Sequence, residues 1–461
     1  MKLGILPLGR PTFDVPYAET KLAAMLTALD ATGHEICGPR DLLFDADATR
    51  AGIATLQAAG VDHVMLLQVT FTDASMTVAV ANAFEQPLSI WAVPEPRNGG
   101  RLRLNAFCGL NLASHALRRN GRDFGWLYAD PGADVASDLE DVLSGQRQAG
   151  KLVASDRPPA TEDGTRIADA IRGRRIARIG EHPEGFDTCA YDGDAMRALA
   201  GVTVDALALE DLFSRARAVP DLTAKVLRNE ADQVLAGLDE VDQPQLDRSL
   251  RLKAGLDALR GAGQYDAFAI RCWPETFTEY GGAVCGPAGM LGEAKVPCAC
   301  EADVYGALTQ LILMEAAQAP VFLTDLVDMD SDDDTGVVWH CGQAPMSMRD
   351  PNVAAEATVH TNRRQPLLFQ FPLKPGTVTL MRISQADRVP HMVLSTAEML
   401  ERPMAFTGTS GVMQFSSPAR TVLDRMIASG LEHHMALAYG DHVETLKGVA
   451  GAMNLPVLEL C

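Results

Sequence analysis

Short apolar runs alternate with amphipathic helical stretches through the first third of the chain. Lys2 to Leu8, Val61 to Gln68 and Leu88 to Val93 read as strands, and Ala18 to Thr32 and Ala74 to Phe84 read as helices between them. Strands separated by helices cannot pair through tight hairpins, so each helix returns the chain to the same end of the sheet. The pattern predicts a parallel, doubly wound sheet.

A second unit of the same kind follows a segment with linker composition. Lys151 to Thr165 contains a Pro-Pro pair and several charges, which is typical of an exposed connection. Beyond it, Ile176 to Ile179, Val204 to Leu209 and Tyr265 to Arg271 read as strands, and Gln243 to Leu259 as a helix. Neither unit carries a glycine-rich phosphate loop, so we expect no nucleotide cofactor.

The last third of the chain has a different order of predicted strands and helices. From about Pro297 one long helix (Glu301 to Ala316) leads into a strand (Val321 to Val327) and several β-rich segments, which predicts an antiparallel sheet or barrel. With 461 residues and about 150 residues per domain, we expect three domains. They cover residues 1–160 (an α/β domain), 161–296 (a second α/β domain) and 297–461 (a β-rich domain). The predicted class is α/β, with two doubly wound Rossmann-like domains and a C-terminal mixed, β-rich, barrel-like domain.

The charge balance excludes some kinds of partner. The chain carries 60 acidic and 40 basic residues, for a formal net charge of -20. A protein that coats nucleic acid or an anionic membrane surface needs a surplus of lysine and arginine. No apolar run approaches the roughly 20 residues of a membrane-spanning helix. Because the nine cysteines form no CxxC pair, we expect reduced thiols and a cytoplasmic protein.

Two carboxylates in the last third stand where rigid backbone would fix them. We expect Glu301 to open a helix and Asp325 to end a buried strand. Six of the ten histidines lie in the same third, and carboxylates together with imidazole suit Mn²⁺, Co²⁺ or Fe²⁺. A helix-dipole partner for Glu301 and a turn residue for Asp325 are the competing interpretations.

The adjacent pair His433-His434 is harder to explain as packing alone. Strand alternation in the following Met435 to Tyr439 sends the two imidazoles to opposite faces. We therefore expect one ring to face a site while the other packs or hydrogen-bonds as its support.

The acidic run Asp328 to Asp334 suggests a calcium loop at first sight. It lacks the glycine and the glutamate that an EF-hand beginning at Asp328 requires. We expect a solvated loop, or a loop whose charge steers metal toward Asp325.

Several motifs of the chain resemble the L-fucose isomerase and L-arabinose isomerase superfamily, most closely the L-fucose isomerase-like proteins. The resemblance is specific after about residue 270 and fainter in the first third. It rests on these segments: Trp273-Pro274-Glu275, Cys300-Glu301-Ala302-Asp303-Val304-Tyr305-Gly306, Thr324-Asp325-Leu326-Val327, Trp339-His340-Cys341-Gly342, Lys374-Pro375-Gly376-Thr377 and Glu432-His433-His434-Met435.

The resemblance implies a metal-dependent proton transfer. Glu301 and Asp325 would bind a divalent cation, Mn²⁺ or else Co²⁺, Fe²⁺ or Mg²⁺, and would exchange the protons of an aldose–ketose isomerisation through a cis-enediol. The metal-binding histidine of the superfamily would fall on His434. His340 matches a further histidine ligand of the arabinose isomerase branch only.

The resemblance also implies a homo-oligomer, a hexamer or similar ring, in which the N-terminal domain closes the site of a neighbouring subunit. The candidates for sugar contacts from that domain are Arg10, Phe13, Gln68 and Trp91, with strand-end packing as the alternative for each. In the last domain, Arg363 and Arg364 are candidates for binding a sulfonate, phosphate or carboxylate of the substrate. Ion pairs with surface acids are the alternative for these two arginines.

Three functions are consistent with these features. The first is an isomerase of a free five- or six-carbon sugar such as L-fucose or D- or L-arabinose. The second is an isomerase of an anionic sugar such as sulfoquinovose, motivated by the arginines. The third is a non-catalytic sugar-binding protein, which would have no use for a pair of proton-transferring carboxylates.

Overall fold

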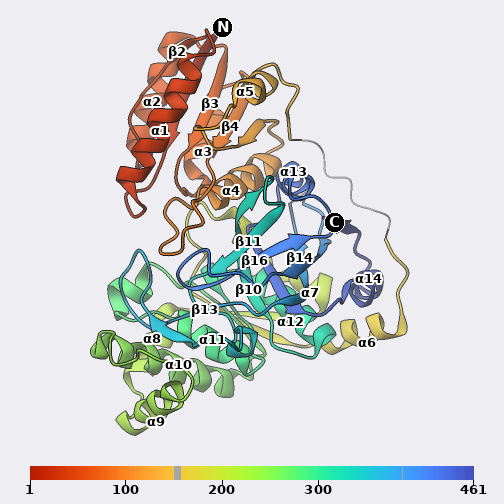
Figure 1. Cartoon of the computed structure of the whole chain (residues 1–461). Helices are drawn as coiled ribbons and strands as arrows, with labels where there is room; N and C mark the ends of the chain where they lie inside the picture. Colours follow the sequence, from red (N-terminus) through yellow and green to blue (C-terminus); the bar gives the residue numbers. More distant parts are fainter. Residues whose placement is uncertain (150–156, 387) are drawn as a thin grey trace.

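The computed structural model describes residues 1–149, 157–386 and 388–461, which form three sheets (Figure 1). The first is a five-stranded parallel sheet in the order β2-β1-β3-β4-β5. Its strands are β1 (Lys2–Leu8), β2 (Glu35–Cys37), β3 (His63–Gln68), β4 (Leu88–Ala92) and β5 (Gly125–Tyr128). Its helices are α1 (Val15–Asp30), α2 (Ala46–Ala59), α3 (Ala74–Ala83), α4 (Ala106–Arg119) and α5 (Ala136–Leu143).

The N-terminal sheet has the doubly wound character that its sequence predicts. Every residue of β3 and of β4 is buried, because both faces of a doubly wound sheet are covered. The carboxylates of Asp14, Asp45 and Asp73 cap the first three helices by accepting backbone N–H groups.

The second sheet is parallel as well, with the order β7-β6-β8-β9. Its strands are β6 (Arg175–Ile179), β7 (Thr203–Leu207), β8 (Ala267–Ile270) and β9 (Cys298–Ala299). The helices of this part are α6 (Glu162–Ile171), α7 (Gly193–Ala200), α8 (Leu209–Arg217), α9 (Asp221–Asp232), α10 (Gln243–Gly263) and α11 (Cys285–Glu293), with the short turns η1 (Asp187–Cys189), η2 (Thr276–Tyr280) and η3 (Cys300–Ala302).

The expected linker is only partly a connection. Residues 151–156 of it lie outside the described part of the chain, and helix α6 already begins at Glu162, capped by Thr161. This helix packs against α14 (Val443–Ala452) near the C-terminus, and the two are side by side in Figure 1. The contact is close enough that a Cβ atom on Gly164 would lie 2.1 Å from the backbone of Gly448.

The third sheet is mixed and has the order β12-β13-β16-β11-β10-β17-β14-β15-β18. Its strands are β10 (Phe322–Asp330), β11 (Thr335–His340), β12 (Glu356–Thr358), β13 (Leu368–Pro372), β14 (Gly376–Ser384), β15 (His391–Met399), β16 (Thr409–Phe415), β17 (His434–Tyr439) and β18 (Val457–Glu459). The remaining elements are α12 (Val304–Ala317), η4 (Met346–Met348), α13 (Ala419–Ser429) and α14.

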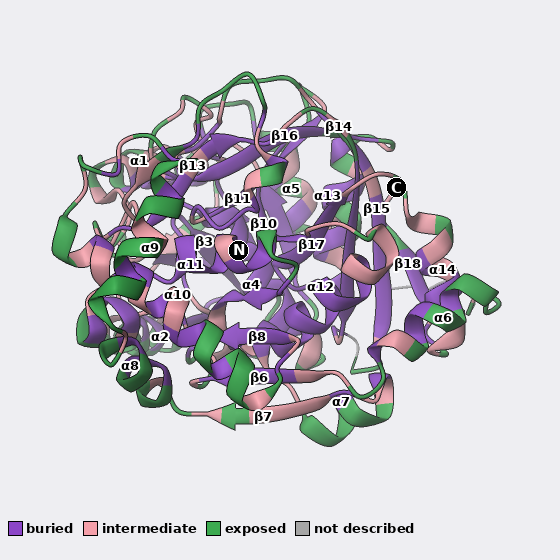
Figure 2. Cartoon of the chain, turned by 90° about the horizontal axis from the view of Figure 1, so that it is seen from below, coloured by how far each residue is buried: buried purple, intermediate pink, exposed green. Residues whose placement is uncertain are grey.

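An additional pairing between β15 and β16 closes six of these strands into a barrel. The closed ring runs β16-β11-β10-β17-β14-β15 and back to β16, so none of the six has a free edge within it. This confirms the predicted class, two Rossmann-like sheets followed by a barrel-like, β-rich part. In Figure 2 the ring strands are purple, which marks them as buried, and green exposed segments dominate the outer helices α8 and α9.

The acidic run is not the solvated loop that its composition predicts. Strand β10 continues to Asp330, and Asp328 within it is buried. Its carboxylate accepts hydrogen bonds from Arg97 Nε at 2.5 Å and from the Tyr128 hydroxyl, both in the N-terminal part of the chain. Since a buried charge needs such partners, this aspartate joins the barrel to the first domain. The charges after Asp330 form the turn between β10 and β11.

No helix among the described residues is long and apolar enough to cross a membrane.

Candidate active site

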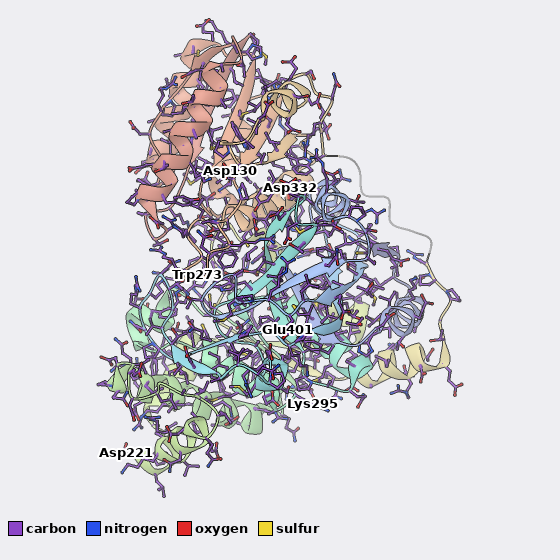
Figure 3. The ribbon with its side chains drawn as sticks, in the orientation of Figure 1. Asp130, Asp221, Trp273, Lys295, Asp332 and Glu401 are labelled. Atoms are coloured by element: carbon purple, nitrogen blue, oxygen red, sulfur yellow. The ribbon has the colours of Figure 1, made fainter. Side chains whose placement is uncertain are left out.

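A cavity opens where the three parts of the chain meet. Trp273, labelled in Figure 3, lies at this junction, below the N-terminal domain. The cavity is lined by residues from all three parts: Arg10, Thr12, Phe13, Phe71, Leu102, Asn105 and Cys108 from the first, Cys272, Trp273, Phe277, Cys285, Cys300 and Glu301 from the second, and Asp325, Trp339, His340, Cys341, His360, Thr361, Asn362, Arg363 and His433 from the third.

Glu301 is held in this cavity by an unusual backbone. The sequence predicts that it opens a helix, but the helix begins at Val304 and its N-cap is Asp303, whose side chain accepts the Gly306 N–H at 2.8 Å. Glu301 itself precedes the helix with φ 58° and ψ 24°, in the left-handed region that costs a residue with a Cβ about 1 kcal/mol or more. This conformation presents the carboxylate to the cavity instead of to the helix dipole.

Two hydrogen bonds orient the Glu301 carboxylate. Trp273 Nε1 donates to Oε1 at 3.0 Å, and His433 Nε2 lies 2.9 Å from Oε2. Burial alone would raise the pKa of Glu301, but the contact with His433, the charge of His434 and the indole N–H lower it to about 2.

Asp325 and His434 face each other across two strands of the barrel. They are paired in the antiparallel register of β10 and β17, and His434 Nε2 lies 3.5 Å from Asp325 Oδ1 and 3.8 Å from Glu301 Oε2. Burial raises the pKa of Asp325 to about 7, opposed by the charge of His434 and reinforced by that of Glu301. The geometry brings both predicted carboxylates to the same imidazole nitrogen.

Strand alternation predicts that His433 and His434 point to opposite faces, but in the structure they do not. Strand β17 begins at His434, so the alternation does not extend back to His433. Both rings lie beside Glu301, with centroids 4.0 Å apart.

The other nitrogen of His434 is bound by a fully buried ion pair. His434 Nδ1 lies 2.9 Å from Asp303 Oδ2, and Arg382 donates to both oxygens of Asp303, at 2.5 and 3.1 Å. All three side chains are at most 1% exposed. Burial would raise the pKa of Asp303, but the Arg382 guanidinium and His434 hold it well below its ordinary value. A proton on Nδ1, donated to Asp303, leaves the Nε2 lone pair directed at Glu301 and Asp325.

This donor set fits a divalent metal ion. Asp325, His340 and His434 bring one nitrogen or oxygen atom each within 4.8 Å of one another, and Glu301 Oε2 lies 3.8 Å from His434 Nε2. Asp325 Oδ1 is buried and accepts no hydrogen bond from any described residue, so this oxygen is available to a metal ion. The carboxylate behind His434 is the support that metal-bound histidines receive in proteins.

His340 occupies the same place in a different role. The backbone N–H of Cys341 donates to His340 Nδ1 at 2.8 Å, and burial lowers the pKa of His340 to about 3. A neutral ring that accepts at Nδ1 carries its proton on Nε2. In this tautomer His340 is a hydrogen-bond donor and has no lone pair for a metal.

The comparisons with known proteins agree with this chemistry. Residues 4–152 match the family model described as the N-terminal domain of fucose/sulfoquinovose isomerase. Sulfoquinovose isomerase of Priestia megaterium is 28% identical over 452 residues, which is 98% of this chain and 97% of that protein. Sulfoquinovose isomerase of Alkalicoccus urumqiensis is 29% identical over 460 residues, covering 99% and 98% of the two chains.

The chain is thus similar to the fucose/sulfoquinovose isomerases in its N-terminal part and to the sulfoquinovose isomerases over nearly its whole length. It is an intramolecular oxidoreductase of the aldose–ketose isomerase kind.

Two arginines lie beside Trp273 in the same cavity. The guanidinium carbon of Arg10 lies 6.0 Å from the Trp273 ring centroid, and that of Arg363 lies 5.9 Å from it. Arg10 is paired with Asp73. Arg363 is half-buried and forms no ion pair with any described residue. The pKa of its guanidinium is lowered by burial and by the nearby charge of Arg10.

The structure places only one of the remaining predicted substrate residues in the cavity. Phe13 lines the cavity, but Gln68 and Trp91 are fully buried inside the N-terminal domain. Gln68 donates to the Thr70 carbonyl at 2.6 Å, and Trp91 Nε1 donates to the Ala129 carbonyl at 3.1 Å. Arg364 is exposed and does not line the cavity. The N-terminal residues that do line it belong to the same chain as the carboxylates.

Sequence reasoning left three residues of the site without a role. Trp273 and Asp303 stand inside the motifs that carry the resemblance, and an aspartate before a helix is visible as a cap in the sequence. His360 accepts the backbone N–H groups of Asn362 and Arg363 at Nδ1, each at 3.2 Å, and so shapes the loop that carries Arg363. No local sequence pattern predicts that role for His360.

Proposed function

We propose that this enzyme isomerises a sulfonated aldose, sulfoquinovose or a close relative, to the corresponding ketose. The observation that carries the proposal is a cavity lined both by the carboxylate pair and by a half-buried arginine that forms no ion pair with any described residue. A buried positive charge without a counterion favours an anionic ligand. The names of the relatives point to the same substrate.

In the proposed reaction Glu301 and Asp325 move one proton between neighbouring carbons. The proton at C2 of the aldose leaves to a carboxylate oxygen while O1 gains a proton, which gives a cis-enediol; a proton is then delivered to C1 while O2 gives up its own, which gives the ketose. Trp273 and His433 keep the Glu301 oxygens in place during this transfer.

We propose that Glu301, Asp325 and His434 hold a divalent cation, Mn²⁺ or a similar ion. Such an ion supplies Lewis acidity that stabilises negative charge on the sugar oxygens. His340 Nε2, which carries its proton, is available as a donor to the same oxygens. The buried Asp303–Arg382 pair fixes the ring of His434 for this role.

The arginine distinguishes this proposal from an isomerase of neutral L-fucose or arabinose. A neutral sugar would leave the Arg363 charge uncompensated in the cavity, whereas a sulfonate would pair with it. The carboxylate pair disfavours the non-catalytic sugar sensor, because recognition alone needs no proton-transferring groups.

The test is a panel of sugars incubated with protein loaded with Mn²⁺ in deuterated water and followed by NMR. We expect ketose formation and deuterium incorporation with sulfoquinovose, and much slower turnover of L-fucose and L-arabinose. Glu301→Gln should abolish both signals, and a chelator should abolish them reversibly. Equal turnover of neutral and sulfonated sugars would overturn the substrate assignment, and no ketose from any sugar would overturn the reaction.

A homo-oligomer and a cytoplasmic location remain predictions. The cavity is lined by Arg10 and Phe13 of the same chain's N-terminal domain. Light scattering coupled to size-exclusion chromatography measures the subunit number directly.

A further inference from the structure

Asn105, the residue before α4, places an uncharged polar side chain in the cavity. The proposed proton transfer gives this side chain no role. Asn105 lines the cavity and is 9% exposed. Its carbonyl oxygen Oδ1 is buried and receives no hydrogen bond from any described residue. A buried acceptor without a donor is costly, so native structures rarely keep one unless a ligand or water supplies the donor.

Asn105 occupies a position where its side chain would ordinarily serve the helix. It is the N-cap of α4, but its side chain makes no capping hydrogen bond. Its backbone lies in the left-handed region with φ 50° and ψ 34°, which turns the side chain away from the first turn of the helix. Asparagine tolerates this region better than most residues do, although it remains strained there.

A buried carboxylate holds the backbone in this conformation. Glu95 Oε1 accepts the N–H of Leu104 at 2.5 Å and the N–H of Asn105, and Oε2 accepts the N–H of Arg103 at 3.1 Å. The backbone N–H of Glu95 in turn donates to Asp328 at 3.2 Å. Three consecutive backbone donors are thus fixed by one side chain, and the backbone of the same residue is hydrogen-bonded to the barrel.

The anchor is the strand that carries Asp325. Asp328 lies three residues after Asp325 on β10, so one strand sets the position of a reacting carboxylate and, through Glu95, of Asn105. The Asn105 side chain is also within hydrogen-bonding reach of the Cys108 thiol, and Cys108 Sγ lies 3.8 Å from the Leu326 carbonyl. Asn105 therefore belongs to the carboxylate end of the cavity.

We propose that Asn105 Oδ1 accepts a hydrogen bond from a sugar hydroxyl close to the reacting carbons, and that Glu95 is the positioning residue that holds Asn105 there. The inference rests on the proposed function, because the donor is a hydroxyl of the substrate. A single acceptor at a fixed place discriminates between epimers, since only one of the two configurations directs its hydroxyl at Oδ1. Asn105 would thus determine which stereoisomer enters productively.

The first variant removes the side chain without changing the backbone requirement. Asn105→Gly keeps access to the left-handed region, whereas alanine would add strain. We expect KM for sulfoquinovose to rise about tenfold with little change in kcat, because a lost hydrogen bond to a non-reacting hydroxyl weakens ground state and transition state alike. Asn454→Gly is the matched control, since Asn454 is also left-handed (φ 56°) but exposed and outside the cavity.

The second variant tests the positioning role. Glu95→Gln replaces one acceptor oxygen by an NH₂ group that faces backbone N–H donors. We expect its KM to rise as well, and the double variant Glu95→Gln/Asn105→Gly to have the same KM as Asn105→Gly alone. If Glu95 acted on the structure independently of Asn105, the KM of the double variant would instead exceed that of Asn105→Gly. Additive effects would overturn the positioning role.

Binding separates the inference from the proposed function. Calorimetry with sulfoquinovose on the inactive Glu301→Gln background, with and without Asn105→Gly, measures affinity independently of turnover. If the wild type forms ketose but Asn105→Gly changes neither KM nor affinity, the role of Asn105 is wrong and the proposed function stands. If the wild type neither binds sulfoquinovose nor forms ketose, both are wrong. A tenfold affinity loss confined to Asn105→Gly supports the inference.

Discussion

Asp325 and His434 are directly opposed residues of neighbouring antiparallel strands, with 3.5 Å between Asp325 Oδ1 and His434 Nε2. Because β10 and β17 belong to a closed ring of strands, the backbone ladder sets this separation and no loop has to order to create it. Glu301 joins them from the turn before α12, which itself is capped by Asp303, the partner of His434.

Asp303→Asn should weaken metal binding without touching a ligand. Asparagine at this position no longer favours the His434 tautomer with a free Nε2, so we expect Mn²⁺ affinity to fall about 10- to 100-fold. It also leaves Arg382 buried without its counterion, which costs about 3–5 kcal/mol of folding free energy. Isothermal titration with Mn²⁺ and urea unfolding measure the two effects.

The double variant Asp303→Asn/Arg382→Met separates these effects. Replacing the guanidinium by an apolar side chain removes the unpaired charge, so stability should largely return while Mn²⁺ affinity stays low. Wild-type metal affinity in either variant would contradict the role given to Asp303.

Trp273→Phe should lower kcat through Glu301. The variant keeps the aromatic ring but removes the N–H that holds Glu301 Oε1 at 3.0 Å, and we expect kcat to fall about tenfold. Trp339→Phe is the matched control, because Trp339 also lines the cavity but donates to the Thr407 carbonyl instead. Steady-state kinetics that show the same loss of kcat in both variants would argue against a specific effect on Glu301.

Arg363→Gln should affect only anionic substrates. Losing a charge-assisted hydrogen bond to a sulfonate should raise KM for sulfoquinovose about 10- to 100-fold, with no change for slow neutral substrates. Arg364→Gln provides the control, because Arg364 is adjacent in sequence but exposed and outside the cavity. Kinetics on one sulfonated and one neutral aldose decide the matter, and a parallel loss on both sugars would disprove sulfonate binding by Arg363.

Glu95 should make folding stability depend on pH. Burial raises its pKa from 4.5 to about 7, against the three backbone N–H donors and with the help of the Asp328 charge. A carboxyl whose pKa is raised by folding stabilises the native state fully below the unfolded value, and that stability is lost as pH rises through the folded value. Relative to Glu95→Gln, the wild type should therefore lose on the order of 3 kcal/mol between about pH 4.5 and 7 and little beyond.

Urea unfolding at half-unit pH intervals checks this window. Asp328 with its partner Arg97, Tyr128 and the loop at Arg103 face Glu95 and are present in both proteins, so their contributions cancel in the difference. Identical pH profiles for the two proteins would show that Glu95 does not titrate in this range.

The sequence predicted the parallel sheets and the barrel-like part because these depend on local patterning. Alternating strand and helix patterns are enough to predict a doubly wound sheet, even when the bounds of each element are inexact. Strand β16 (Thr409–Phe415) escaped the prediction, and with it the closure of the barrel, because Gly411 interrupts its apolar pattern. Ring closure is a long-range pairing that no segment encodes by itself.

The sequence predicted the reacting groups of the site, but not the backbone conformation and contacts that hold them. Glu301, Asp325 and His434 converge, but the left-handed backbone of Glu301 contradicts the expected helix start, since propensity cannot foresee strain held by tertiary contacts. The buried partner of Asp303 is Arg382, 79 positions along the chain, and Asn105 depends on Glu95 through backbone N–H groups alone. Such relationships appear only once the chain is folded.

The closed ring of strands has a consequence for how this protein could be altered. Two of its members carry Asp325 and His434, whereas Arg363 stands on a surface-reaching segment between β12 and β13, outside the ring. Replacing residues 360–365 should therefore redirect the enzyme to another acidic or neutral sugar while the reacting groups keep their spacing. The groups that transfer protons and the arginine that would select the charge of the sugar thus lie on separate parts of the fold, so the barrel could accept a new charge preference without losing its reacting groups.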